Sequence, residues 1–103
     1  MDILTDRFDR RIRLTDERKT HIFRRSEMIN QEAKIIETLK DPDIISYTAL
    51  DKTVHLYYKF YKSTPVTQKY LLVAVKILNS EGFIVASFFT NKVKKGELIW
   101  QKT

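Results

Sequence analysis

The run Leu71-Leu72-Val73-Ala74-Val75 decides the fold of this chain. Five consecutive apolar residues, two of them β-branched, are typical of a strand that is covered on both of its faces. We expect this strand to extend over residues 69–78 and to lie inside a sheet, with the other elements arranged around it.

Further strands are predicted on both sides of this run. Residues 53–61 are dense in β-branched and aromatic side chains, and 79–82 (Asn-Ser-Glu-Gly) predict a hairpin turn in which Gly82 can adopt a positive φ. The expected strands are 43–47, 53–61, 69–78, 83–90 and a short edge strand at about 97–100. Residues 10–15 alternate between polar and apolar and can form one more short strand.

The N-terminal part predicts helices. Thr15 can cap a helix, and the two acidic residues that follow it favour the positive end of the helix dipole. Apolar residues then recur at helical spacing, at Ile22, Ile29, Ala33 and Ile36. We expect helices over about 16–26 and 28–40, with a bend near 26–27, and Pro42 to stop the second one.

These elements predict an α+β fold, with two N-terminal helices packed on an antiparallel sheet of about four strands. The 103 residues, 43% of them hydrophobic, are expected to form one domain over 1–103. The absence of cysteine excludes a disulfide framework and a thiolate site. No apolar run is long enough for a membrane span and the first residues do not resemble a signal peptide, so a soluble, cytoplasmic protein is expected.

Charge is unevenly distributed along the chain. Residues 1–51 hold 10 Lys and Arg against 11 acids (net −1), and residues 52–103 hold 9 Lys against 2 acids (net +7), which sums to +6. A one-sided positive charge indicates a polyanionic partner, with nucleic acid first and an anionic membrane surface second. The alternative is that the charge serves solubility alone.

Strand 53–61 sorts its side chains by parity onto two faces. Val54, Leu56, Tyr58 and Phe60 share one face, and His55, Tyr57, Lys59 and Tyr61 share the other. The second set can bind nucleic acid, because Tyr and His stack on bases and Lys pairs with phosphate. Lys76 and Ser87 would extend a basic strip if they face the same way as Lys59. The alternative is an ordinary solvated sheet face.

His21 is the second candidate. It lies four residues after Glu17 and four before Arg25, so the three share one face of the first predicted helix. A histidine between an acid and an arginine suits acid–base chemistry beside a phosphate. The alternative is a surface histidine without a role. No residue pattern marks a metal site, and the two glycines cannot form a phosphate-binding loop.

Several short motifs resemble the barnase–EndoU–colicin–RelE-like superfamily of phage- and toxin-type ribonucleases. They are Leu14-Thr15-Asp16-Glu17-Arg18, His21-Ile22, Glu27-Met28, the segment 37–45, Tyr57-Tyr58-Lys59, the run 71–75, and the segment 83–88. The likeness covers about residues 10–100. It implies a two-helix, four-stranded domain that cleaves RNA without metal, often as a toxin held in check by an antitoxin.

The resemblance also implies site residues. His21 would be the catalytic histidine, Arg24 or Arg25 would contact the phosphate, Tyr57 or Lys59 would lie on the central strand, and Ser87 or Thr90 on the later one. The chain departs from the expected His-Pro-Glu, since it has Arg25-Ser26-Glu27 there. The absent second histidine puts the general acid in question.

The leading hypothesis is a metal-independent, cofactor-free endoribonuclease of toxin type that leaves 2′,3′-cyclic phosphate and 5′-hydroxyl ends, with RNA and an acidic antitoxin as partners and no membrane. The expected catalytic residues are His21, Arg24, Arg25, Tyr57, Lys59 and Ser87. The expected substrate-binding residues are His55, Tyr58, Lys76, Thr90, Lys92, Lys94 and Lys95. The alternatives are a non-catalytic nucleic-acid-binding module and a protein-interaction domain, such as an inhibitor or immunity protein, with a basic face.

Overall fold

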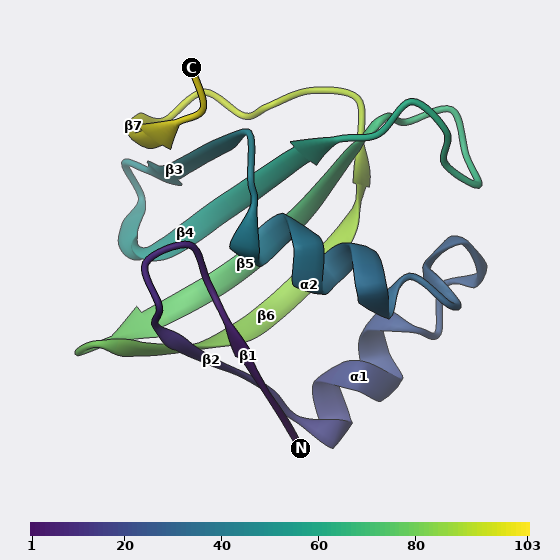
Figure 1. The fold of residues 1–103 in the computed structure, drawn as a ribbon, viewed down its shortest axis with the longest axis horizontal. Coiled ribbons are helices and arrows are strands. Elements are labelled where there is room, and N and C mark those ends of the chain that lie inside the picture. The colour runs from purple at the N-terminus through teal and green to yellow at the C-terminus, as the bar shows by residue number, and fades with distance from the viewer.

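In the computed structural model, which describes residues 1–103, a seven-stranded sheet carries two short α-helices on one face (Figure 1). The strands are β1 (Asp2–Thr5), β2 (Arg11–Leu14), β3 (Ile44–Thr48), β4 (Asp51–Phe60), β5 (Tyr70–Leu78), β6 (Glu81–Thr90) and β7 (Glu97–Gln101). The helices are α1 (Asp16–Ile22) and α2 (Glu32–Lys40), with a 3₁₀ turn at Ser26–Met28 between them. Neither helix has the length and apolar character that crossing a membrane requires.

The predicted fold of two N-terminal helices on a four-stranded antiparallel sheet is wrong. The strand order is β1-β2-β6-β5-β4-β3-β7, and β2 runs parallel to β6, so the sheet is mixed and has seven strands. A β1–β2 hairpin extends the sheet beyond β6, and β7 completes the other edge beside β3. The central strands lie within two residues of their predicted positions, but the sheet around them is wider than the sequence indicated.

Both helices are shorter than predicted. Thr15 caps α1 by accepting a hydrogen bond from the Arg18 amide at 3.2 Å, yet α1 ends at Ile22 instead of near residue 26. Asn30 adopts a φ of 67°, which an α-helix cannot contain, so α2 begins only at Glu32. The segment between the helices is therefore a turn that leads the chain from α1, which lies against β6, to α2, which packs mainly on β5.

The helices cover the β4 face that carries His55, Tyr57, Lys59 and Tyr61. Tyr57 is fully buried there in the main core, together with Ile35 and Leu39 of α2 and alternate residues of β5. The opposite face holds a second, smaller cluster of buried residues, namely Leu56, Tyr58, Leu72 and Ala74. The connection from β6 to β7 covers part of this face, because the Lys94 amide donates to the Tyr58 hydroxyl at 3.1 Å. We call this side of the sheet the open face.

The β1–β2 turn is held to the sheet by a buried carboxylate. Asp6, which is 2% exposed, accepts hydrogen bonds from the Tyr57 hydroxyl at 2.5 Å and from Nε of Arg10 at 2.8 Å. Its other oxygen accepts from the backbone amides of Phe8 and Arg10, each at 2.9 Å. Four donors satisfy this carboxylate, so the turn is tied to β4 by charge and by hydrogen bonds together.

Gly82 has a different role from the one predicted, because no glycine has a positive φ and Asn79 takes that conformation in the hairpin, with φ 60°. A Cβ on Gly82 would lie 2.9 Å from both the Lys76 carbonyl oxygen and Cγ1 of Val75.

We expect Gly82→Ala to lower the free energy of unfolding by about 1–3 kcal/mol, as measured by urea denaturation, because the neighbouring strand must move. Ser80→Ala in the same exposed turn is the control, and an equal loss in both variants would contradict the steric explanation.

Candidate functional site

Helix α1 lies beside the C-terminal half of β6. This half of β6 pairs with β5 along one edge and has no strand along its other edge. Strand β2 pairs only with Gly82 and Phe83, so the edge of β6 beyond them is left to the helix. Nη1 of Arg18 is 3.4 Å from the Val85 carbonyl oxygen, and Nζ of Lys19 pairs with Asp2 of β1 at 2.9 Å. These contacts fix which side of α1 is turned toward β6.

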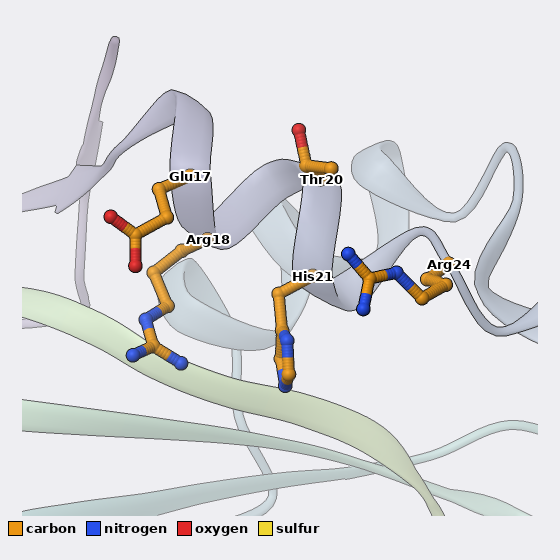
Figure 2. Close-up of a pocket in the computed structure, with 5 residues that line it drawn as sticks. All are labelled: Glu17, Arg18, Thr20, His21 and Arg24. Atoms are coloured by element: carbon orange, nitrogen blue, oxygen red, sulfur yellow. The ribbon is translucent and has the colours of Figure 1, made fainter.

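A polar hollow of about 390 Å³ runs along α1, and no hydrophobic side chain lines it (Figure 2). Its lining residues are Glu17, Arg18, Thr20, His21 and Arg24. Figure 2 shows the His21 ring pointing from the helix toward the strand below, with the Arg18 guanidinium on one side and the Arg24 guanidinium on the other. A carboxylate, an imidazole and two guanidinium groups therefore share one accessible space.

The arginines around His21 are free to bind an anion. Arg18, Arg24 and Arg25 make no ion pair, whereas Arg10 pairs with Asp6 and Arg13 pairs with Glu81. Guanidinium groups bind phosphate oxygens in a bidentate manner. Three unpaired guanidinium groups beside a histidine are thus suited to a phosphate diester.

A second, smaller hollow of about 130 Å³ lies between α1 and β6, and we call it the strand hollow. Its lining residues are His21, Ile22, Arg25, Ala86, Ser87 and Phe88. His21 lines both hollows and so joins them. Of the predicted catalytic residues, Arg24 lines the polar hollow, and Arg25 and Ser87 line the strand hollow. Arg25 comes after the end of α1 and is not a helical neighbour of His21.

Ser87 takes part in the strand hollow mainly through its oxygen lone pairs. It is 4% exposed, and its hydroxyl donates to the Leu72 carbonyl oxygen at 2.9 Å. The hydroxyl proton is thereby occupied, so the side chain can accept a hydrogen bond from a ligand but is not poised to donate one.

Tyr57 and His55 are not in the site, contrary to prediction. Both lie on the helix-covered face of β4, which is two strands away from β6. Burial, and then the adjacent Asp6 carboxylate, raise the pKa of Tyr57, so its hydroxyl stays a donor to Asp6. Burial and the nearby Arg10 lower the pKa of His55, which favours the neutral ring stacked on Tyr47.

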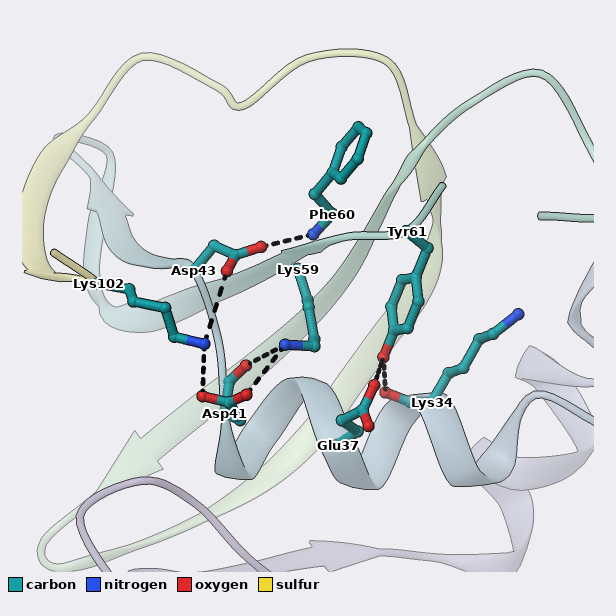
Figure 3. A network of polar contacts seen from close by, with 8 residues as sticks. All are labelled: Lys34, Glu37, Asp41, Asp43, Lys59, Phe60, Tyr61 and Lys102. Atoms are coloured by element: carbon teal, nitrogen blue, oxygen red, sulfur yellow. Dashed lines mark hydrogen bonds and ion pairs between the residues drawn. The ribbon is translucent and has the colours of Figure 1, made fainter. Parts of the chain in front are cut away.

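Lys59 is also outside the site, because it belongs to a network at the end of α2 (Figure 3). Its Nζ donates to the Asp41 carboxylate at 3.1 Å and to the Asp41 carbonyl oxygen at 2.9 Å. Lys102 pairs with the same carboxylate at 2.7 Å, and Lys102 and then Lys59 lower the pKa of Asp41. Both lysines hold the end of α2 against β4 and the C-terminal segment.

The predicted basic strip does not form. Lys76 pairs in register with Val54, so it faces the side opposite to Lys59, and it donates to Asp51 at 3.2 Å. The hydrogen bonds from Thr53, and then Lys76, lower the pKa of Asp51 to about 2. Tyr58 is buried on the open face, where burial raises its pKa.

The remaining predicted substrate-binding residues follow β6 in the chain. Thr90 ends β6, with its hydroxyl 3.3 Å from the Lys92 carbonyl oxygen. Lys92, Lys94 and Lys95 are exposed in the connection to β7. None of the three lines either hollow, and the connection turns over the open face, where the Lys94 amide donates to the Tyr58 hydroxyl.

Sequence reasoning missed Arg18 and Thr20 and did not include Glu17 among the site residues. The available signal was helical spacing, since Arg18 lies three residues and Glu17 four residues before His21. No group of three or more His, Asp or Glu side chains is arranged to hold a metal ion. Comparison with protein-family models, with curated proteins and with solved structures found no match to this chain.

Proposed function

We propose that this protein is an endoribonuclease that needs no metal ion and uses the α1–β6 site. The observation that carries the proposal is that His21 lines both hollows among three arginines that have no acidic partner. The arginines would hold the scissile phosphate.

In the proposed reaction the Glu17 carboxylate accepts the proton of the ribose 2′-hydroxyl. The 2′-oxygen then forms a bond to phosphorus while the bond from phosphorus to the 5′-oxygen breaks. The imidazolium of His21 donates its proton to that leaving oxygen. Arg18 and Arg24 offset the negative charge that develops on the phosphoryl oxygens. The products are a 2′,3′-cyclic phosphate and a 5′-hydroxyl.

Three features support this assignment. Glu17 and His21 line the same hollow, so a base and an acid can act on one substrate. The neighbouring guanidinium groups have no acidic partner, and the exposed lysines at 92, 94 and 95 add positive charge to the connection that follows β6. In the proposed reaction every proton transfer uses side chains of the site, which is the basis for proposing a reaction without metal.

The proposal is tested with the substrate. We expect the protein to cleave single-stranded RNA in excess chelator and to leave 2′,3′-cyclic phosphate ends, seen by mass spectrometry of the fragments. A 2′-deoxy substitution at one linkage should abolish cleavage there and nowhere else, because that linkage lacks the nucleophile. Protein with Arg18→Gln and Arg24→Gln, prepared in parallel, controls for contaminating nucleases. Cleavage that requires added metal, or cleavage at the deoxy linkage, would refute the mechanism.

The proposal includes a cytoplasmic location and an acidic protein partner of the antitoxin type. A carboxylate-rich partner segment that pairs with Arg18, Arg24 and Arg25 would block the phosphate site directly. A non-catalytic RNA-binding module is the rival, and it predicts salt-sensitive RNA binding without any fragment in the same experiment.

A further inference from the structure

The strand hollow has the size of a single aromatic ring. Its volume is about 130 Å³, and an apolar protein cavity of about 150 Å³ is known to take benzene. A six-membered ring therefore fits the strand hollow, whereas a two-ring purine would extend out of it.

The lining of the strand hollow suits a nucleobase. Its apolar lining residues are Ile22, Ala86 and Phe88, which meet at the edge of β6, and Ile22 is only 3% exposed. The Arg25 guanidinium carbon lies 5.6 Å from the centroid of the Phe88 ring, so a cationic plane and an aromatic ring border the same space. Aromatic rings and guanidinium planes are the groups on which proteins stack unpaired bases of RNA.

Polar groups can orient the base within the strand hollow. The Ser87 oxygen has its proton committed to the Leu72 carbonyl oxygen and so presents only lone pairs. Uracil offers a ring N–H and cytosine an exocyclic amino group, and either can donate to that oxygen. A base held there has its pairing edge occupied, so it cannot be part of a duplex.

From these observations we infer that the strand hollow is a binding site for one unpaired pyrimidine base next to the phosphate bound in the polar hollow. This inference rests on the proposed function, because His21 links the two hollows. It assigns the substrate class as single-stranded RNA with a pyrimidine beside the cleaved linkage.

The inference is tested by binding, with RNA that cannot be cleaved. Hexamers of 2′-fluoro-uridine and 2′-fluoro-adenosine lack the 2′-hydroxyl, and their dissociation constants are measured by fluorescence anisotropy at fixed salt. We expect wild type to bind the uridine hexamer about tenfold more tightly than the adenosine hexamer. Phe88→Ala removes the aromatic ring that borders the strand hollow and should abolish this preference.

Two further variants keep the test decisive. Phe83→Ala makes the same change at another half-buried position of β6, outside both hollows, and should keep the tenfold preference. Arg25→Gln leaves the sheet untouched and should also reduce the preference, which tests the site even if Phe88→Ala fails to fold. Equal binding of the two hexamers by wild type, or an unchanged preference in Arg25→Gln, would overturn the inference.

The outcomes separate this inference from the proposed nuclease activity. A uridine preference that depends on Arg25 and Phe88, together with no cleavage of ordinary RNA, supports the base site and refutes the nuclease. Cleavage of ordinary RNA with no base preference refutes the base site and leaves the nuclease standing.

Discussion

His21→Ala is expected to slow RNA cleavage by about 10²–10⁴-fold, the usual contribution of a positioned acid or base. His21 is the one imidazole in the α1–β6 site, and alanine removes the proton that the leaving 5′-oxygen needs. The rate is measured under single-turnover conditions with chelator present, so that binding and product release do not mask the chemical step. RNA affinity should change little, because the arginines that hold the phosphate remain.

The chain offers a matched control in its only other histidine. His55→Gln removes an imidazole that lies on the helix-covered face of β4, away from both hollows. We expect this variant to cleave RNA at a rate close to that of wild type. A similar loss in both variants would mean that the effect arises from stability, and undiminished cleavage by His21→Ala would show that His21 has no catalytic role.

Asp6→Asn is expected to lower the free energy of unfolding by about 3–5 kcal/mol, the cost of removing one partner from a buried ion pair. The Asp6 carboxylate is fully buried, and the Arg10 side chain beside it is only 20% exposed. Asparagine removes the negative charge and places an amide where four donors now meet an acceptor. The guanidinium of Arg10 is then left without its counterion. Urea denaturation followed by circular dichroism measures the loss.

Asp9→Asn is the control for this substitution, because it makes the same chemical change in the same turn. Asp9 is exposed and has a φ of 62°, a conformation that asparagine adopts as readily as aspartate. The free energy of unfolding of the Asp9→Asn variant should stay within about 0.5 kcal/mol of that of wild type, as for most surface substitutions. If Asp6→Asn were equally mild, the buried carboxylate would not be what holds the β1–β2 turn to β4.

The local sequence pattern predicted the positions of the central strands but not how the strands pair within the sheet. Strands β4, β5 and β6 were predictable because each keeps a long run of apolar or alternating residues, which depends on its own sequence alone. Strand β1 was missed because four residues carry too little pattern to distinguish a strand from a loop. Its pairing with β2, and that of β2 with β6, are decided by contacts across the chain.

The face of β4 that the helices cover could not be read from the sequence. Both faces carry aromatic residues, so parity separates the two sets without saying which is buried. Tyr57 was predicted to face RNA because it is polar. Its burial is possible because the carboxylate of Asp6, which lies 51 residues away in the chain, accepts a hydrogen bond from its hydroxyl. Because of this error, Tyr57, His55 and Lys59 were predicted as site residues, although all three lie outside the α1–β6 site.

By itself the sequence determined the positions of the central strands, the surplus of positive charge in the second half, and the nearness of His21 to its neighbouring arginines. These properties follow from spacing along one segment, which fixes which side chains share a face. Only the tertiary structure decided that α1 lies against the free edge of β6, which brings Ser87 and Phe88 to His21. It also decided which cationic side chains form ion pairs. Lys59 and Lys76 pair with carboxylates from other segments, while the three arginines around His21 pair with none. Pairing between distant segments depends on the whole fold, and no local spacing encodes it.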